Sequence, residues 1–247
     1  MRGAKHRYYG QPRQDAARAA PHEATGSIVF AVADGVSSAT TPELGAVEAC
    51  RATVERMLHL LSQGQEPPDF QDVAALAADR LCRLARSRLN KEEVEPAEVA
   101  GLYATTLVAG VVRPDPAGPV VDLCRIGDSG AWLLDRSTGR YRQLFDSKTG
   151  TDAVLVSNEV TPLPYVPDPL PRISTRLAPH DVLLIGTDGF GDPLGDGDGQ
   201  VGSLFARHLA EPPTSLWFAH LVDFTRETFD DDRTLLAIWP RTTAASR

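Results

Sequence analysis

Apolar and polar positions divide this chain into segments of different periodicity. Residues 27–33 form a short apolar run, rich in β-branched side chains, that ends at an Asp-Gly pair, and this pattern predicts a buried strand. Two helices are predicted after it, at about 42–62 and 69–90, because apolar side chains recur there every three or four residues. Thr41 is the expected N-cap of the first helix and Pro42 its first residue. The side chains expected to face the core are Leu44, Val47, Cys50, Val54, Met57 and Leu61 in the first helix and Phe70, Val73, Leu76, Leu84 and Leu89 in the second.

From residue 105 onward the pattern changes to short strands. Turns separate apolar runs at residues 105–112, 120–126, 131–134 and 141–144, which predicts an antiparallel meander. Residues 146–171 hold five prolines and no clear period, so we expect an extended surface segment there. Further strands are predicted at 173–177, 182–185 and 234–239, and helices at about 201–210 and 213–229.

This order of elements lacks the regular alternation of strand and helix that a parallel sheet requires. It fits an α+β fold in which antiparallel sheets are covered by helix pairs. The chain has 247 residues, of which 42% are hydrophobic, so its length suits one large or two small domains. We expect a single domain over residues 1–247, with short flexible termini at about 1–8 and 241–247.

The charge balance narrows the classes of partner. With 33 acidic and 25 basic residues the formal net charge is −8, and the sequence offers neither a basic stripe for nucleic acid nor a polybasic arm for an anionic membrane. A phosphorylated substrate would therefore need a cation to offset the field of the protein. The N-terminus lacks the apolar core of a signal peptide, and no run approaches the roughly 18 apolar residues of a membrane span. We expect a cytoplasmic protein.

The three cysteines do not suggest a disulfide framework or a zinc site. Cys50, Cys82 and Cys124 are odd in number and widely spaced in apolar or helical contexts, as expected of buried, reduced thiols. The six histidines show no ligand spacing. The tryptophans, Trp132, Trp217 and Trp239, lie in apolar periodic runs and are expected in the core.

Four aspartates each stand beside an apolar run that is predicted to be a strand. Asp34, Asp128 and Asp188 follow such runs, and Asp231 precedes the last one. A single Asp-Gly turn is common, but several carboxylates brought together would repel each other and lose hydration unless hard divalent cations neutralised them. The recurrence therefore suggests metal-assisted hydrolysis. Gly35, directly after Asp34, would let the backbone turn and leave its carbonyl open as a further oxygen ligand.

Two other polar groups have weaker interpretations. Asp192, Asp196 and Asp198 alternate with glycines, but their spacing does not match an EF-hand, so a flexible turn is favoured. Thr105 and Thr106 suit a strand by propensity alone, and a supporting hydrogen-bond role near the aspartates is the alternative.

The motifs, taken in order, resemble those of the metal-dependent protein serine/threonine phosphatases of the PPM or type 2C family, in particular its compact bacterial members. The resemblance spans residues 13–235. It implies a four-layer α-β-β-α sandwich, with two antiparallel sheets flanked by helix pairs. The segments that carry it are Arg13-Gln14-Asp15-Ala16, Ala33-Asp34-Gly35-Val36-Ser37-Ser38, Ala104-Thr105-Thr106-Leu107, Ile126-Gly127-Asp128-Ser129, Gly186-Thr187-Asp188-Gly189-Phe190 and Asp231-Asp232-Arg233-Thr234-Leu235.

The same resemblance implies a set of metal ligands. Asp34 would bridge two Mn²⁺ or Mg²⁺ ions, with Asp188 and Asp231 completing one of them. The Gly35 carbonyl and waters would hold the second ion, with Asp15 as a direct or water-mediated ligand. Asp128 would help Asp188 to hold a weaker third ion. Two such ions roughly 3.5–4 Å apart activate a bridging water for in-line attack on phosphorus, so no protein nucleophile is needed.

Three positions depart from the family pattern. Gln14 stands where members usually carry a glutamate, which removes one anionic contact to the second ion. Gly10 aligns with an arginine that contacts the substrate phosphate in many members, and Arg13 or Arg7 could replace it; for Arg13 a solvated surface role is the alternative. Val36 stands where the animal enzymes carry a candidate acid histidine.

The resemblance therefore implies a divalent-metal-dependent phosphatase that acts on phosphoserine or phosphothreonine in a protein partner, such as a substrate of a bacterial Ser/Thr kinase. The alternative is a module of the same fold that binds a phosphoprotein or regulates a kinase without turnover. The sequence does not decide the substrate, the choice between Mn²⁺ and Mg²⁺, or the oligomeric state.

Overall fold

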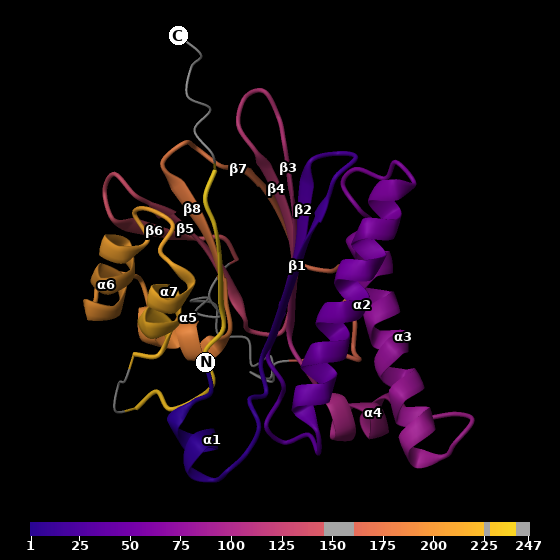
Figure 1. Cartoon of the computed structure of the whole chain (residues 1–247). Coiled ribbons are helices and arrows are strands. Elements are labelled where there is room, and N and C mark those ends of the chain that lie inside the picture. The colour runs from indigo at the N-terminus through magenta and orange to yellow at the C-terminus, as the bar shows by residue number, and fades with distance from the viewer. Residues whose placement is uncertain (146–160, 225–227, 241–247) are drawn as a thin grey trace, which may run out of the picture.

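The computed structural model describes residues 1–145, 161–224 and 228–240. Two antiparallel sheets face each other, and helices cover both outer sides of the pair (Figure 1). The α+β class and the four-layer α-β-β-α arrangement expected from the sequence are confirmed.

The five-stranded sheet has the order β1-β2-β3-β4-β7, and the four-stranded sheet the order β6-β5-β8-β9. The predicted meander is wrong, because β4 and β5 belong to different sheets although only three residues separate them. The strands are β1 (Ala16–His22), β2 (Ser27–Ala33), β3 (Leu107–Arg113), β4 (Val120–Ile126), β5 (Gly130–Asp135), β6 (Arg140–Gln143), β7 (Arg172–Arg176), β8 (Asp181–Gly186) and β9 (Leu235–Ile238).

Strand β1 has no counterpart in the sequence prediction. Most of its side chains are exposed or half-buried, so it shows no apolar run. Its backbone pairs with β2 from Ala16 opposite Ala33 to His22 opposite Ser27. This register continues toward Asp15 and Asp34, which therefore lie at the same end of the two neighbouring strands.

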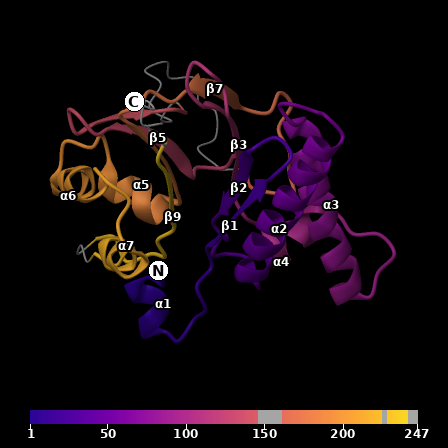
Figure 2. The same cartoon turned by 45° about the horizontal axis from the view of Figure 1, so that its top comes forward.

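Helices form the two outer layers. The α2–α3–α4 side matches the predicted helix pair with α4 added, and α5, α6 and α7 lie on the other side (Figures 1 and 2). Residues 1–8, expected to be flexible, contain α1, whereas residues 241–247 lie outside the described residues. The helices are α1 (Ala4–Tyr8), α2 (Pro42–Ser62), α3 (Phe70–Leu89), α4 (Pro96–Tyr103), α5 (Asp188–Leu194), α6 (Gln200–His208) and α7 (Ser215–Val222).

Three buried clusters separate the four layers. Strand β2 shows how one apolar run serves two of them, because successive side chains point to opposite faces of a sheet. Val29 and Ala31 belong to the cluster under α2 and α3, whereas Phe30 and Val32 belong to the cluster between the sheets. The third cluster lies between the second sheet and α5–α7, and Phe190 is fully buried in it.

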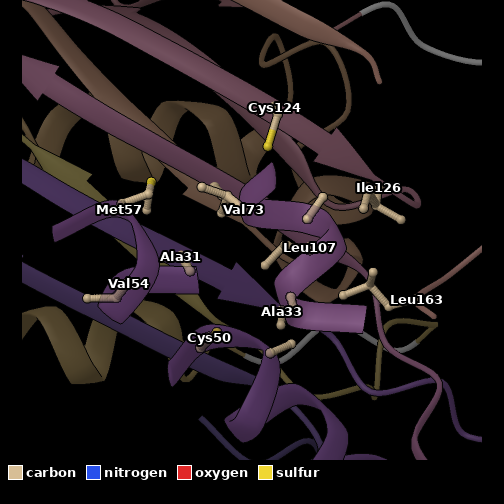
Figure 3. Packing of buried hydrophobic residues seen from close by; sticks show 14 of the residues in the cluster. Ala31, Ala33, Cys50, Val54, Met57, Val73, Leu107, Cys124, Ile126 and Leu163 are labelled. Carbon is tan, nitrogen blue, oxygen red and sulfur yellow. The ribbon is translucent and has the colours of Figure 1, made fainter. Parts of the chain in front are cut away.

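Helix α2 packs on the first sheet through small and medium side chains. Figure 3 shows Cys50, Val54 and Met57 of α2 near Ala31 and Ala33 of β2. The small strand residues let the helix approach closely, so these side chains are fully buried.

Some positions predicted to face the core are exposed. Leu44 is 47% and Val47 is 53% exposed, although both fit the helical spacing of α2. In the same turns Gly45, Ala46 and Ala49 are buried, so these small residues form the packed face of α2, and Leu44 and Val47 lie outside that face. Leu89, at the last position of α3, is 36% exposed. The side chain of Thr41 donates to the carbonyl of Leu102 instead of capping α2.

Two predictions for the second half of the chain are also wrong. Leu163 and Leu170 lie in the predicted surface segment 146–171, yet both are buried in the core under α2 and α3. Residues 146–160 of that segment lie outside the described residues. Trp217, expected in the core, is 46% exposed on α7, whereas Trp132 is buried as predicted.

Helix α7 ends at Val222, so the helix predicted at 213–229 is shorter, and residues 225–227 lie outside the described residues. No helix in the described parts of the chain combines the length and apolar character needed to cross a bilayer.

The packing of α2 predicts different costs for two substitutions on the same helix. Met57→Ala should lower the free energy of unfolding by about 2–5 kcal/mol, because the fully buried side chain leaves a cavity. Leu44→Ala is the control and should change it by less than about 0.5 kcal/mol, because the side chain is already exposed. Urea unfolding measures both; equal losses would contradict this packing.

Candidate active site

The four aspartates singled out from the sequence lie where strands of two different sheets end. Asp34 directly follows β2 and Asp128 follows β4 by two residues, both in the five-stranded sheet. Asp188 begins α5 two residues after β8, and Asp231 lies four residues before β9, both in the four-stranded sheet. The candidate site is therefore built at one end of the sandwich, with both sheets contributing.

Asp34 lies at the centre of this group. Its carboxyl group is hydrogen-bonded to the carboxyl groups of Asp15 and Asp188. Burial and the negative charges of Asp15 and Asp188 raise the pKa of Asp34 far above its ordinary value. Three carboxyl groups in contact cannot all be ionised without a compensating positive charge, so the cluster is suited to binding cations.

Asp15 precedes β1 of the five-stranded sheet, but a residue that follows β8 of the four-stranded sheet binds its side chain. Its side chain is buried, and Thr187, the residue before Asp188, donates a hydrogen bond of 2.8 Å from Oγ1 to Oδ2 of Asp15. Burial raises the pKa of Asp15 to about 6, although the hydrogen bond from Thr187 acts in the opposite direction. One threonine thus connects the end of β8 to the start of β1.

Asp188 and Asp231 line a hollow of about 200 Å³. We call it the Asp231 hollow. Burial raises the pKa of Asp188, and the charges of Asp231 and Asp128 act in the same direction, so both lie within electrostatic range of Asp188. The other lining residues of the Asp231 hollow are Gly189, Asp192, Thr228, Phe229 and Asp230.

A second hollow, of about 350 Å³, contains Asp128 and shares Asp188 and Asp192 with the first. We call it the Asp128 hollow. Asp192, interpreted from the sequence as part of a flexible turn, instead belongs to α5, four residues after Asp188 and on the same helix face. That spacing is the sequence signal that could have identified it.

The donor atoms fit a hard divalent cation. In the described part of the chain, Oδ1 of Asp188 and Oε1 of Gln14 are buried and have no hydrogen-bond partner, and each could accept a cation. Carboxylate and carbonyl oxygens are the ligands that Mg²⁺ and Mn²⁺ prefer. Asp34, Asp188 and Asp15 could hold one or two ions, with Asp231 and Asp128 on either side.

Buried hydroxyl groups fix the backbone around Asp34. Oγ1 of Thr106 accepts a hydrogen bond from the backbone N–H of Asp34 at 3.0 Å and lies 2.7 Å from Oγ of Ser129. Oγ1 of Thr105 donates to the carbonyl of Asp34 at 2.8 Å. Because Ser129 follows Asp128, Thr106 connects the two loops that carry Asp34 and Asp128.

Gly35 is required by close packing. A Cβ at this position would lie 2.7 Å from the backbone of Pro42, where α2 begins. The glycine therefore lets the start of α2 approach the loop after Asp34. Its N–H donates to the carbonyl of Gln14 at 3.3 Å, which joins the Asp34 loop to the residue before Asp15.

The sequence matches the family model described as protein phosphatase 2C over residues 2–224. This chain belongs to the protein phosphatase 2C family. No curated protein sequence matches it.

Solved structures are similar to the chain in fold. A bacterial serine phosphatase is 16% identical with a TM-score of 0.59, and 94% of each chain is covered. The serine/threonine phosphatase Stp1 from Staphylococcus aureus is 14% identical with a TM-score of 0.57, covering 92% of this chain and 89% of that one. RsbX in complex with magnesium is 14% identical with a TM-score of 0.51, covering 92% and 87%. At these identities the comparison shows the phosphatase fold alone.

The fold of this 2C-family chain explains one departure in its sequence. Gly10 follows α1 with a φ of +67°, a left-handed conformation that favours glycine over arginine. Of the two suggested replacements, Arg7 forms an ion pair of 3.1 Å with Asp223, whereas Arg13 is exposed two residues before Asp15. Arg13 is therefore the candidate that stays available, and its contact with phosphate stays a prediction.

Two further residues near the site were missed by the sequence reasoning. His6 and Asp232 are buried, and together with Asp231 they place one possible ligand atom each within 4.8 Å of one another. The Asp-Asp pair at 231–232 was visible in the sequence, but nothing in it distinguished the roles of the two residues. No sequence signal pointed to His6, because α1 brings it to residues more than 200 positions away.

A larger cavity, about 770 Å³, lies at the opposite end of the second sheet. Arg136 and His180 line it, next to the paired positions Asp135 and Asp181, whereas the aspartate cluster lies beyond the Gly130–Gly186 end of the same two strands. The Arg136 guanidinium donates to the carbonyls of Pro179 and Ala210. Its size alone does not make this cavity the active site, because the clustered carboxyl groups lie elsewhere.

Thr106 provides a test of the hydroxyl connection. Thr106→Val keeps the shape but leaves the N–H of Asp34 without its acceptor, so it should lower the free energy of unfolding by about 1–3 kcal/mol. Thr106→Ser keeps the hydroxyl group and should recover most of that loss. Urea unfolding measures the difference, and equal stability of the two variants would contradict the assigned hydrogen bond.

The raised pKa values predict a pH-dependent stability in the absence of divalent ions. Unfolded aspartate titrates near pH 4, below the raised folded values, so the unfolded state loses its protons first as pH rises. The free energy of unfolding therefore falls as pH rises from about 4 to the folded pKa of Asp15, about 6. The loss due to Asp34 continues to higher pH, because its folded pKa is raised further.

Asp34→Asn replaces the central carboxyl group, which must take up a proton on folding at pH 8, with an amide that stays neutral in both states. In EDTA it should raise the free energy of unfolding at pH 8 by about 1–3 kcal/mol and reduce the loss of stability between pH 5 and pH 8. Urea unfolding at the two pH values measures this. A variant that is less stable than the wild type at pH 8 in EDTA would contradict the assigned repulsion.

Proposed function

We propose that this 2C-family chain is a divalent-metal-dependent phosphatase that hydrolyses phosphoserine or phosphothreonine in a protein substrate. The observation that carries the proposal is the partly buried carboxyl group of Asp34, hydrogen-bonded to both Asp15 and Asp188. Such a cluster is costly to bury by itself, and divalent cations are the partners that balance its charge.

The roles proposed for the residues come from the family resemblance, and their positions support them. Asp34 would bridge two ions, with Asp188 and Asp231 on one of them and Asp15 and the Gly35 carbonyl near the other. Asp128 would contribute to a weaker third site in the Asp128 hollow. When bound, Mn²⁺ or Mg²⁺ supplies charge neutralisation of the phosphoryl group and a lowered pKa of the attacking water. Arg13 would hold the phosphate by charge-assisted hydrogen bonds.

The cysteines do not support covalent catalysis. Cys50 and Cys124 are fully buried, and burial raises the pKa of both thiols. Burial also raises the pKa of the half-buried Cys82. A thiolate nucleophile needs the opposite shift and access to substrate. Attack by water therefore agrees better with these residues than a cysteine-phosphate intermediate does.

The names of similar structures support a phosphoprotein as substrate. They include a bacterial serine phosphatase and a serine/threonine phosphatase from Staphylococcus aureus. By analogy, we infer that the partner is a phosphorylated protein, such as a substrate of a bacterial Ser/Thr kinase. The acidic field of the chain also favours a site in which cations, rather than a basic groove, attract the phosphate.

A non-catalytic module that binds a phosphoprotein is the second candidate. It is favoured by Gln14, which offers a neutral oxygen where an anionic ligand is expected, and by Gly10 in place of an arginine. Calorimetric titration with Mn²⁺ distinguishes the candidates, because metal binding without turnover of any phosphorylated substrate would support the module.

Hydrolysis of an aryl phosphate provides the direct test. The wild type should be active with Mn²⁺ or Mg²⁺ and lose activity in EDTA, and Asp188→Asn should lower kcat at least about 100-fold because a carboxylate ligand is lost. Asp198→Asn, an exposed acidic position outside both hollows, is the matched control and should keep full activity. Full activity of both Asp34→Asn and Asp188→Asn would overturn the proposed site.

A further inference from the structure

The two consecutive aspartates before β9 have opposite environments. The side chain of Asp231 is 45% exposed and lines the Asp231 hollow, whereas that of Asp232 is 2% exposed. A buried carboxylate is costly unless donors surround it. The sequence alone gives both residues the same chemistry, and the fold separates them.

Asp232 is surrounded by donors from the N-terminal part of the chain. Its Oδ1 accepts a hydrogen bond of 2.6 Å from the N–H of Gly3, and its Oδ2 accepts one of 2.5 Å from the N–H of Gln14. Nδ1 of His6, itself buried, lies 3.0 Å from the same Oδ2. Hydrogen bonds to a carboxylate are short and strong, so Asp232 fixes two points of the N-terminal segment, Gly3 and Gln14, with His6 packed beside it.

The residues around Asp232 are neighbours of the proposed metal ligands. Gln14 precedes Asp15. Gly189 follows Asp188, and a Cβ at Gly189 would lie 1.9 Å from the carbonyl oxygen of Asp232. Asp232 itself follows Asp231. Three chain segments that each carry a candidate ligand therefore meet at this one residue.

The N-terminal segment lies directly against the same loop. The N–H of Lys5 donates to the carbonyl of Asp230 at 3.1 Å, and the N–H of Arg233 donates to the carbonyl of Met1 at 2.9 Å. A Cβ at Gly3 would lie 2.3 Å from the carbonyl oxygen of Asp230 and the carbonyl carbon of Asp231. Figures 1 and 2 both show the N-terminus and α1 beside the segment that leads into β9.

We propose that Asp232 is a positioning residue, which fixes the spacing of Asp15, Asp188 and Asp231 by anchoring residues 3–14 under the candidate metal site. This inference rests on the proposed function, because it assumes that these three aspartates bind cations. Asp232 acts through its neighbours: both of its oxygens are already engaged by backbone N–H groups. Asp231, with its exposed side chain, remains the direct ligand.

The competing interpretation is that His6, Asp231 and Asp232 bind a cation of their own, because each offers a ligand atom in one small region. The hydrogen bonds from Gly3 and Gln14 argue against it, since a cation at Asp232 would compete with two backbone N–H donors for which the described residues offer no other acceptor. The two interpretations predict different metal stoichiometries.

Gly3→Ala tests the anchor without changing any side chain near the ions. The added methyl group must push the backbone of residues 230–231, so the Kd for Mn²⁺ should rise about tenfold, as it does when groups that orient ligands are disturbed. Gly101→Ala is the matched control. It is an exposed helical position where a Cβ meets nothing within 4 Å, so the Kd should not change.

Asp232→Asn tests the carboxylate itself. The amide keeps one acceptor but turns an NH₂ group toward an N–H donor, so the Kd for Mn²⁺ should again rise about tenfold with an unchanged number of bound ions. Because ligand spacing is disturbed but no ligand is lost, excess Mn²⁺ should recover most of kcat and leave the KM for an aryl phosphate unchanged. Calorimetry measures Mn²⁺ binding independently of turnover.

Two outcomes would overturn the assignment. One is a Kd for Mn²⁺ that stays at the Gly101→Ala value in both Gly3→Ala and Asp232→Asn, since Asp232 would then serve stability alone. The other is a lower Mn²⁺ stoichiometry in Asp232→Asn, since Asp232 would then be a ligand. Failure of the proposed function would look different: wild-type protein that binds no Mn²⁺, or binds it with no phosphatase activity.

Discussion

The candidate site depends on several carboxyl groups that are held close together in a partly buried cluster. Asp34 touches Asp15 and Asp188, and Asp231 and Asp128 act on Asp188 from either side. Each charge loses hydration and repels the others, so the cluster opposes folding unless something offsets it. The hydrogen bond from Thr187 to Asp15 offsets part of this cost, and divalent cations are the partners expected to offset the rest.

A sandwich of two sheets is well suited to hold such a cluster. Both faces of the central strands are covered, so β2 from Ile28 onward and β8 from Val182 onward consist of apolar residues up to the ends that lead into the site. Polar residues can then be added just beyond the strands, where two sheets that pack on one another bring four loops together. Two glycines allow the close contacts between these loops and their neighbours. Gly35 lets α2 approach the Asp34 loop, and Gly189 lets the turn at Asp188 pack against Asp232. Loss of either close contact would move ligands rather than remove them.

The success of sequence reasoning varied with how strongly each segment was patterned. Helices α2 and α3 and strands β2 and β4 have long periodic or continuous apolar runs, and their bounds agree with the prediction within about one residue. Strand β1 has mostly exposed side chains, so the sequence shows no apolar pattern that would predict its pairing with β2. Leu44 and Val47 follow the apolar spacing of α2, yet Gly45, Ala46 and Ala49 form the packed face in those turns. Apolar spacing alone did not identify that face, because small residues occupy it.

The sequence by itself determined the fold class, the order of the motifs and the aspartates at strand ends, because these depend on local patterns and on spacing along the chain. Tertiary structure alone decided which of these residues meet. Asp231 and Asp232 are identical in sequence chemistry, but only the position of residues 3–14 makes one a half-exposed candidate ligand and the other a buried anchor. His6 joins them from the other end of the chain, and such contacts are invisible in sequence because they depend on how the layers are placed in space.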